Sequence, residues 1–350
     1  MKLVTFAVDT PLGSFERLGA AIDKPRPMIV DLNAACGAWF ERKGRPQAVA
    51  DALVPPDILR FLEIGEESLD AARESIEFAR KEGRGEAAKF RDPMGRRVLY
   101  AESEIRLRPP VPRPPAFRDF FAFEDHALKG AARRGEPLSP AWYDQPVYYK
   151  GNHREFYGPG STIPWPSYTR KLDFEAEIAC VVGRRGRDLS PKEAGHHIAG
   201  YAILNDFSAR DIQKNEMLCR MGPAKGKDFA NALGPWLVTA DELENPDDLD
   251  ISVWVNGEKW SSGHSSGRYW SFPAMLSHVS QEETVYPGDI LGSGTYAGGC
   301  GLDLDRWIKP ADTIEIKVSK LGALKNVVGA PKGAVHLKHA GKKAGARGAA

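Results

Sequence analysis

An alternating run of acidic and apolar residues decides the fold of this chain: Leu172-Asp173-Phe174-Glu175-Ala176-Glu177-Ile178-Ala179-Cys180-Val181-Val182. Its period of two predicts a β-strand with Asp173, Glu175 and Glu177 on one face. Carboxylates in a row repel each other unless a cation lies between them. The last residues are apolar on both faces, so we expect this strand to be buried. One interpretation is therefore a divalent cation held by oxygen ligands, and the other is a solvated face with lysine partners.

The composition limits the class of protein. The chain has 350 residues, 42% of them hydrophobic, which suits one large domain or two domains. Lysine and arginine number 48 against 47 acidic residues, so no basic field favours nucleic acid as a partner. Four cysteines without a CxxC or zinc pattern suit a reducing compartment. With no signal peptide and no apolar run long enough for a bilayer, we expect a cytoplasmic protein without a membrane partner.

A proline-rich segment at residues 108–115 predicts an extended linker between two domains. Before it, residues 1–107 are expected to form a small α+β domain, with strands at 2–7 and 28–31. A helix is expected at 66–81, ended by Gly83 and Gly85. After the linker, residues 116–331 are expected to form a β-rich α+β domain. Residues 332–350 are rich in Gly, Ala, Lys and Arg and are expected to be a disordered basic tail.

Strand patterns dominate the second domain. They fall at residues 172–182, 197–204, 235–239, 251–260, 290–293 and 313–318. Asn256-Gly257 predicts a tight hairpin turn within the fourth of these. A short helix is expected at 271–280. This mixture favours an α+β fold over a doubly wound sheet.

Two further segments contain polar groups suited to chemistry. Asp119 and His126 lie among phenylalanines, a setting in which a histidine can act as a general base; the alternative is a helix start capped by Asp119. Asp206 follows an apolar strand and is either a metal ligand or a helix cap. Arg210 can bind a substrate carboxylate, or it can form an ion pair with Asp206 or Asp211.

Two glycine-containing loops complete the candidate site. The loop at 222–231 contains Lys227 and resembles an anion site, although it lacks the pattern of a P-loop. The loop at 291–301 follows a strand, and its glycines allow backbone N–H groups to approach a ligand. No GxGxxG lies in a βαβ unit, which argues against a dinucleotide.

In order and spacing these pieces resemble the fumarylacetoacetate hydrolase family over residues 110–330. The matching positions are Asp119 with His126, Glu175 with Glu177, Asn205-Asp206-x-Ser208-Ala209-Arg210-Asp211-x-Gln213, Lys227-x-Phe229, and Gly292-Ser293-Gly294-Thr295. The resemblance implies a mixed β-sandwich roll preceded by a smaller SH3-like N-terminal domain. It also implies a homodimer.

The resemblance assigns roles to the site residues. The metal would be Mg²⁺, or alternatively Ca²⁺ or Mn²⁺, held by Asp119, Glu175, Glu177 and Asp206. Lys227 and Asn231 would lie beside it, and His126 would be the general base. Tyr149, Arg210, Gln213 and Thr295 would contact the substrate. Asp173 is then interpreted as a solvated neighbour of the ligands.

The sequence departs from the family pattern at the residue that orients the base. The family's hydrolases have a glutamate there. Asp303 is the nearest counterpart, one methylene shorter, and Glu124 is a second candidate. Phe121 stands where some members have a tyrosine that contacts substrate.

The expected function is a metal-dependent hydrolase that cleaves a C–C bond in a small anionic β-dicarbonyl acid, such as fumarylacetoacetate, fumarylpyruvate or an acylpyruvate. In this interpretation His126 deprotonates a water molecule and the metal stabilises the enolate. One alternative is a dehydratase, isomerase or decarboxylase acting on a 2-oxo-3-deoxy sugar acid or a 2-hydroxydienoate. Another is a non-catalytic, metal-stabilised binding protein.

Overall fold

The computed structural model describes residues 1–23, 27–83, 89–243 and 245–333. Gly85 and the predicted tail from residue 334 onward lie outside them. The N-terminal elements are β1 (Lys2–Thr10), β2 (Gly13–Ile22), β3 (Met28–Asp31), α1 (Leu32–Glu41), α2 (Gln47–Leu53), α3 (Ile58–Ile64), α4 (Glu66–Glu82), β4 (Leu99–Tyr100), the 3₁₀ turn η2 (Glu102–Glu104) and β5 (Arg106–Leu107). The remaining elements are β6 (Phe117–Phe120), α5 (Glu124–Arg134), α6 (Ala141–Asp144), β7 (Tyr148–Lys150), β8 (Phe156–Tyr157), β9 (Thr162–Trp165), β10 (Leu172–Asp173), β11 (Ala176–Val182), α7 (Pro191–Gly195), β12 (Ile198–Asp206), β13 (Ser208–Ala209), α8 (Arg210–Leu218), β14 (Asn231–Thr239), β15 (Asp250–Val255), β16 (Glu258–His264), the 3₁₀ turn η3 (Ser265–Gly267), α9 (Phe272–Ser280), β17 (Ile290–Gly292), α10 (Gly301–Leu304), β18 (Thr313–Val318) and β19 (Gly322–Pro331).

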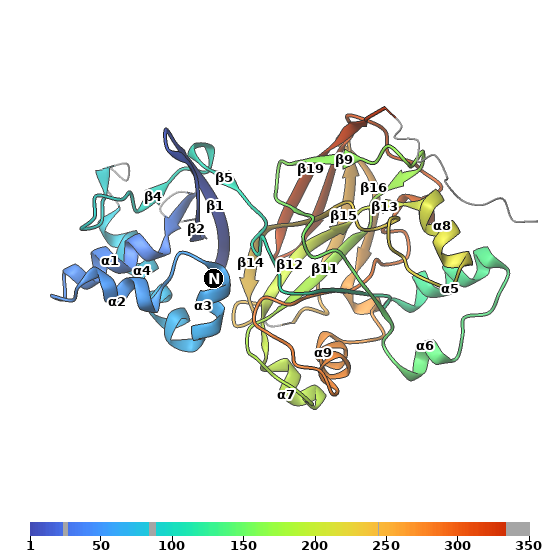
Figure 1. Cartoon of the computed structure of the whole chain (residues 1–350), viewed down its shortest axis with the longest axis horizontal. Helices are drawn as coiled ribbons and strands as arrows, with labels where there is room; N and C mark the ends of the chain where they lie inside the picture. Colours follow the sequence, from blue (N-terminus) through green and yellow to red (C-terminus); the bar gives the residue numbers. More distant parts are fainter. Residues whose placement is uncertain (24–26, 84–88, 244, 334–350) are drawn as a thin grey trace, which may run out of the picture.

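Two mixed sheets form the framework, which confirms the α+β prediction. The larger runs in the order β4-β3-β2-β1-β14-β12-β11-β17-β6-β7, with β5 paired to β1 and β8 paired to β14. The smaller runs β16-β15-β18-β19-β9. Figure 1 shows labelled strands of the smaller sheet (β9, β15, β16 and β19) beside β11 and β12, to the right of β14. β11 lies between two cores: Ala179 and Val181 pack with the N-terminal core, while Ile178 and Cys180 pack with the other.

The N-terminal part consists of antiparallel strands with helices packed beside them (Figure 1). An SH3-like domain is not confirmed here, because β1 to β4 continue the large sheet through the pairing of β1 with β14. Helix α4 ends at Gly83 as predicted. Helix α1 was not predicted, because it is buried on nearly every side and its sequence has no polar face.

The strand predicted at 172–182 is interrupted. Leu172 and Asp173 form β10 and pair with β13, whereas the main strand β11 begins only at Ala176 and pairs with β12 and β17. Glu175 lies in the break, where its N–H donates to the Asn205 side chain. The predicted turn at Asn256 and Gly257 is confirmed, and both residues have positive φ.

In the described part of the chain, no helix is both long enough and apolar enough to cross a membrane.

Candidate active site

Three strands bring three acidic side chains to one place in the large sheet. Asp119 lies on β6, Glu177 near the start of β11, and Asp206 at the end of β12. Strand β17 lies between β11 and β6, and its Gly292 pairs with Asp119. A Cβ on Gly292 would lie 2.2 Å from Asp119 Oδ1, so glycine is what lets this carboxylate lean toward the other two. Asp119 is thus a strand residue and not a helix cap, because α5 begins at Glu124.

These three carboxylates are a candidate metal centre. One oxygen from each lies within 4.8 Å of the others, and all three residues are buried. Among the described residues, no hydrogen-bond partner is found for Asp119 Oδ1, Glu177 Oε1 or Asp206 Oδ1. Burial, reinforced by the neighbouring carboxylates, raises the pKa of Asp119 and of Glu177 well above the ordinary range. Buried acidic oxygens without donors are suited to a hard divalent cation.

Glu175 lies outside this group of three, because its two oxygens are engaged by cations. Arg210 donates to Oε1 at 2.8 Å, and Lys227 Nζ donates to Oε2 and also to Asp206. Burial acts to raise the pKa of Glu175, but Arg210 and Lys227 together lower it below the ordinary range. Of the four metal ligands predicted from the sequence, three converge and the fourth joins them through Lys227.

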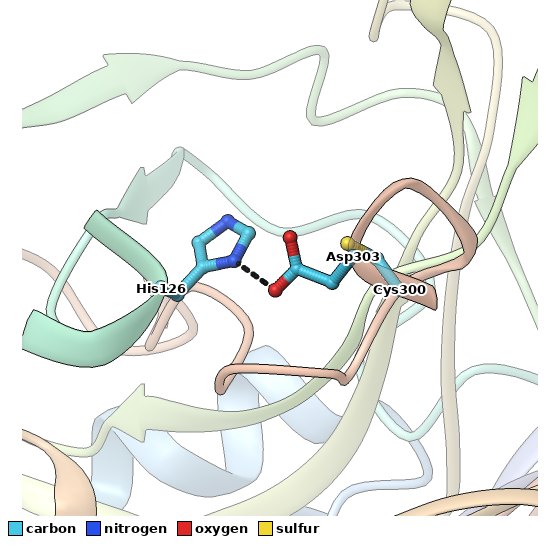
Figure 2. Close-up of side chains that lie close together, drawn as sticks. All are labelled: His126, Cys300 and Asp303. Carbon is cyan, nitrogen blue, oxygen red and sulfur yellow. Dashed lines mark hydrogen bonds and ion pairs between the residues drawn. The ribbon is translucent and has the colours of Figure 1, made fainter. Parts of the chain in front are cut away.

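His126 and Asp303 meet as a pair (Figure 2). His126 Nδ1 lies 2.8 Å from Asp303 Oδ2. Arg133 donates to Oδ1 at 2.9 Å, and the backbone N–H of Gly298 donates to Oδ2 at 2.9 Å. Burial acts to raise the pKa of Asp303, but the hydrogen bond and charge of His126, with Gly298 and Arg133, lower it to about 2. The ionised carboxylate only accepts, so Nδ1 is the donor in this pair and Nε2 is the ring nitrogen that can act as the base.

Asp303 therefore reaches His126 despite its shorter side chain. The other candidate, Glu124, instead accepts a hydrogen bond from the Tyr143 hydroxyl at 2.6 Å. The thiol of Cys300 also lies close to the pair (Figure 2). Burial raises the pKa of this thiol well above its ordinary value, so it stays protonated and is a poor metal ligand.

The contacts of Arg210 within the protein differ from the two ion pairs considered as the alternative to a substrate contact. Its guanidinium donates to Asp173 at 2.7 Å, to Glu175 at 2.8 Å and to Gln213 Oε1 at 3.0 Å. Neither predicted ion pair, with Asp206 or with Asp211, is formed. Asp173 is fully buried, so its interpretation as a solvated neighbour was wrong. The alternation of the sequence could not reveal this, because Asp173 belongs to the separate strand β10.

The other predicted substrate contacts lie around the same centre. Tyr149 donates its hydroxyl proton to Asp206 at 2.9 Å. Thr295 is buried and donates to the backbone carbonyl of Ala176 at 2.8 Å. Asn231 pairs with Asp206 across β12 and β14. Within the described part of the chain, neither polar atom of its buried side chain has a hydrogen-bond partner. An unpartnered amide opposite Asp206 is a further candidate ligand group.

Comparison with known proteins places this site in context. The family model described as fumarylacetoacetate (FAA) hydrolase C-terminal matches residues 116–329. Oxaloacetate tautomerase YisK from Bacillus subtilis is 28% identical over 315 residues, which cover 89% of this chain and 96% of that protein. A 2,4-didehydro-3-deoxy-L-rhamnonate hydrolase from a Sphingomonas species is 32% identical over 208 residues, 59% of this chain and 70% of that protein.

Solved structures share the fold over nearly the whole chain. Fumarylacetoacetate hydrolase from Exiguobacterium antarcticum has a TM-score of 0.64 at 23% identity, covering 94% of this chain and 99% of that one. Maleylpyruvate hydrolase from Sphingobium sp. SYK-6, in complex with manganese(II) and pyruvate, has a TM-score of 0.64 at 20% identity, covering 94% of this chain and 100% of that one.

Proposed function

Because the chain belongs to the fumarylacetoacetate hydrolase family, we propose that it is a metal-dependent hydrolase that cleaves a C–C bond in a 2,4-dioxo acid. The observation that carries this proposal is the pairing of His126 Nδ1 with Asp303 Oδ2 at 2.8 Å. A histidine held by a buried, ionised aspartate is the arrangement that general-base activation of water requires.

The buried charges support a divalent cation as the cofactor. Five buried carboxylates gather here: Asp119, Asp173, Glu175, Glu177 and Asp206. The ion pairs of Arg210 and Lys227 reach only Asp173, Glu175 and Asp206. Asp119, Glu177 and Asp206 would hold Mg²⁺, or Ca²⁺ or Mn²⁺ in its place, with Glu175 and Asn231 beside them. A bound cation supplies Lewis-acid stabilisation of the negative charge that develops on the substrate's carbonyl oxygens.

The chain's own residues then account for the proton transfers. His126 Nε2 accepts a proton from water, and the hydroxide adds to the carbonyl carbon remote from the substrate's carboxylate. The bond between that carbon and the adjacent methylene breaks, and the electron pair passes to the methylene carbon. His126 returns its proton there, so one water molecule is consumed and two carboxylic acids are formed. General acid–base catalysis of this kind contributes about 10²–10⁴-fold.

Tautomerisation of a 2-oxo acid is a second candidate reaction. It is favoured by the relative named oxaloacetate tautomerase, which aligns over 89% of this chain. The same base could move a proton between carbon and oxygen without consuming water. The two reactions therefore differ in products and not in the groups that they require.

A substrate screen tests the proposal. Acylpyruvates, fumarylpyruvate and oxaloacetate would be incubated with the protein and Mg²⁺, and the products identified by mass. We expect cleavage of at least one 2,4-dioxo acid into two acids, and loss of this activity in His126→Ala with metal binding retained. Loss of enol absorbance without cleavage of any compound would instead support the tautomerase. Full activity in His126→Ala would contradict both, because each needs the base.

A further inference from the structure

Asp173 is a buried carboxylate to which neither reaction gives a role. Its two oxygens accept four hydrogen bonds. Oδ2 accepts from Arg210 Nε at 2.7 Å and from the Leu302 N–H at 3.0 Å. Oδ1 accepts from the Gly301 N–H at 2.8 Å and from the Phe174 N–H at 2.9 Å. Every donor that Asp173 meets is thus an N–H group, a set that only an ionised carboxylate satisfies in full.

These donors come from two sides of the active site. Gly301 and Leu302 open the α10 turn (Gly301–Leu304), which also contains Asp303. Arg210 opens α8 and holds Glu175, which Lys227 links to Asp206 of the carboxylate group. Asp173 therefore contacts both the segment that orients His126 and the arginine beside the candidate metal centre.

The approach of the α10 turn to Asp173 is close. A Cβ on Gly301 would lie 2.5 Å from Asp173 Oδ1 and 2.2 Å from the carbonyl oxygen of Arg306. Glycine is therefore needed at 301 for the turn to lie against the carboxylate. Leu302 is the direct neighbour of Asp303, so a shift of the turn changes the geometry at His126.

We propose that Asp173 is a positioning residue that fixes the α10 turn and the Arg210 guanidinium in one arrangement, so that Asp303 meets His126. This inference rests on the proposed role of His126 as a base. Misplacement of a reacting group by about 1 Å can lower the rate about 10²-fold. We therefore expect Asp173→Asn to lower kcat by about 10- to 100-fold, since its amide NH₂ must face two N–H donors in either orientation.

A purely structural role would lower stability without changing chemistry, and the chain offers a matched control. Asp31 is also fully buried, accepts hydrogen bonds from Arg17 and the Ala34 N–H, and lies in the N-terminal part. Asp31→Asn removes the same charge from a comparable arginine pair. We expect it to lower the thermal midpoint while leaving kcat within about threefold of wild type.

The test measures kcat on the cleaved 2,4-dioxo acid and the ¹⁵N resonances of His126. Asp173→Asn should lower kcat and raise the share of the Nε2–H tautomer of His126, whereas Asp31→Asn should do neither. The double variant of Asp173→Asn with Asp303→Asn should be no slower than Asp303→Asn alone, because both act through His126. Gly301→Ala disturbs the same contact from the α10 turn, because the added Cβ would collide with Asp173. It should reproduce the tautomer shift, and it replaces Asp173→Asn in the test if that variant does not fold.

Two outcomes separate this inference from the proposed function. If His126→Ala abolishes turnover but Asp173→Asn and Gly301→Ala keep kcat and the His126 tautomer of wild type, Asp173 has no positioning role although the function stands. If the wild-type protein cleaves no 2,4-dioxo acid, the proposed function fails. The ¹⁵N tautomer measurement then tests only whether Asp173 positions Asp303 against His126. An unchanged His126 spectrum in Asp173→Asn and Gly301→Ala would overturn that positioning role.

Discussion

Replacing Asp303 by asparagine removes the charge that orients His126. The carboxylate has its pKa lowered from 3.8 to about 2, a difference that corresponds to about 2.5 kcal/mol of stabilisation of the ionised form in the folded protein. Arg133, one of its three partners, is partly exposed, so solvent screening reduces this to about 2 kcal/mol. Because the pKa is lower in the folded state, this stabilisation is fully present above pH 4 and is lost as the pH falls toward 2.

Two measurements follow from this charge. Asp303→Asn should lower the free energy of unfolding near pH 7 by up to about 2 kcal/mol and flatten its dependence on pH between 4 and 2. In the assay with a 2,4-dioxo acid, kcat should fall by about 10²-fold or more, because an amide can accept from Nδ1–H but does not stabilise the imidazolium. Denaturant titrations at several pH values and steady-state kinetics measure the two effects.

Matched variants show whether the effect belongs to this carboxylate. Asp303→Glu retains the charge and should keep part of the activity. Glu124→Gln alters the other acidic candidate, which contacts Tyr143 and not His126, so kcat should stay within about threefold of wild type. A kcat for Asp303→Asn within threefold of wild type, or a large loss in Glu124→Gln, would refute the assignment of Asp303 as the partner of the base.

Three further predictions concern the buried acids. Since burial raises the pKa of Asp119 and Glu177, metal binding near neutral pH should release protons and weaken as the pH falls. Calorimetry in two buffers of different ionisation enthalpy measures this release, and equal observed heats in the two buffers would count against it. Glu177→Gln should weaken Mn²⁺ binding about tenfold or more without unfolding the chain. The paramagnetic relaxation of water measures this affinity, and an unchanged affinity would remove Glu177 from the ligand set. Burial raises the pKa of Asp289 to about 6, so the stabilising contribution of its protonated form is present below pH 4 and is lost as the pH rises through 6. Asp289→Asn should therefore raise the free energy of unfolding at pH 8 by up to about 3 kcal/mol, as measured by denaturant titration. A variant that is less stable than wild type at pH 8 would show that the contact of Asp289 with Arg118 dominates.

The sequence predicted the central strand and most of its neighbours because their patterns are local. Apolar residues on both faces of β11 predicted a buried strand, and its contacts with two cores confirm this. The hairpin at Asn256 and Gly257 followed from turn chemistry alone. By contrast, α1 is buried on almost all sides, so its sequence has no amphipathic period to recognise.

The sequence predicted which residues belong to the candidate site, but not all of the contacts that they make with one another. Asp119, Glu177 and Asp206 converge because β6, β11 and β12 belong to one sheet, and it was the family resemblance that named them together as ligands. The partners of Arg210 could not be read from spacing. Asp173 and Glu175 both accept from its guanidinium, and this shared contact depends on the break between β10 and β11. The reach of Asp303 depends on the α10 turn, which no local pattern determines.

The central claim is that a base held by Asp303 activates water beside a metal held by buried carboxylates. Its most direct test is turnover of a 2,4-dioxo acid in H₂¹⁸O by the Mg²⁺-loaded protein, with His126→Ala beside it. We predict one ¹⁸O atom in the carboxylate newly formed at the cleaved carbonyl, dependence on the added metal, and no turnover in His126→Ala. Consumption of substrate without ¹⁸O in a cleavage product, or equal turnover by His126→Ala, would contradict the account.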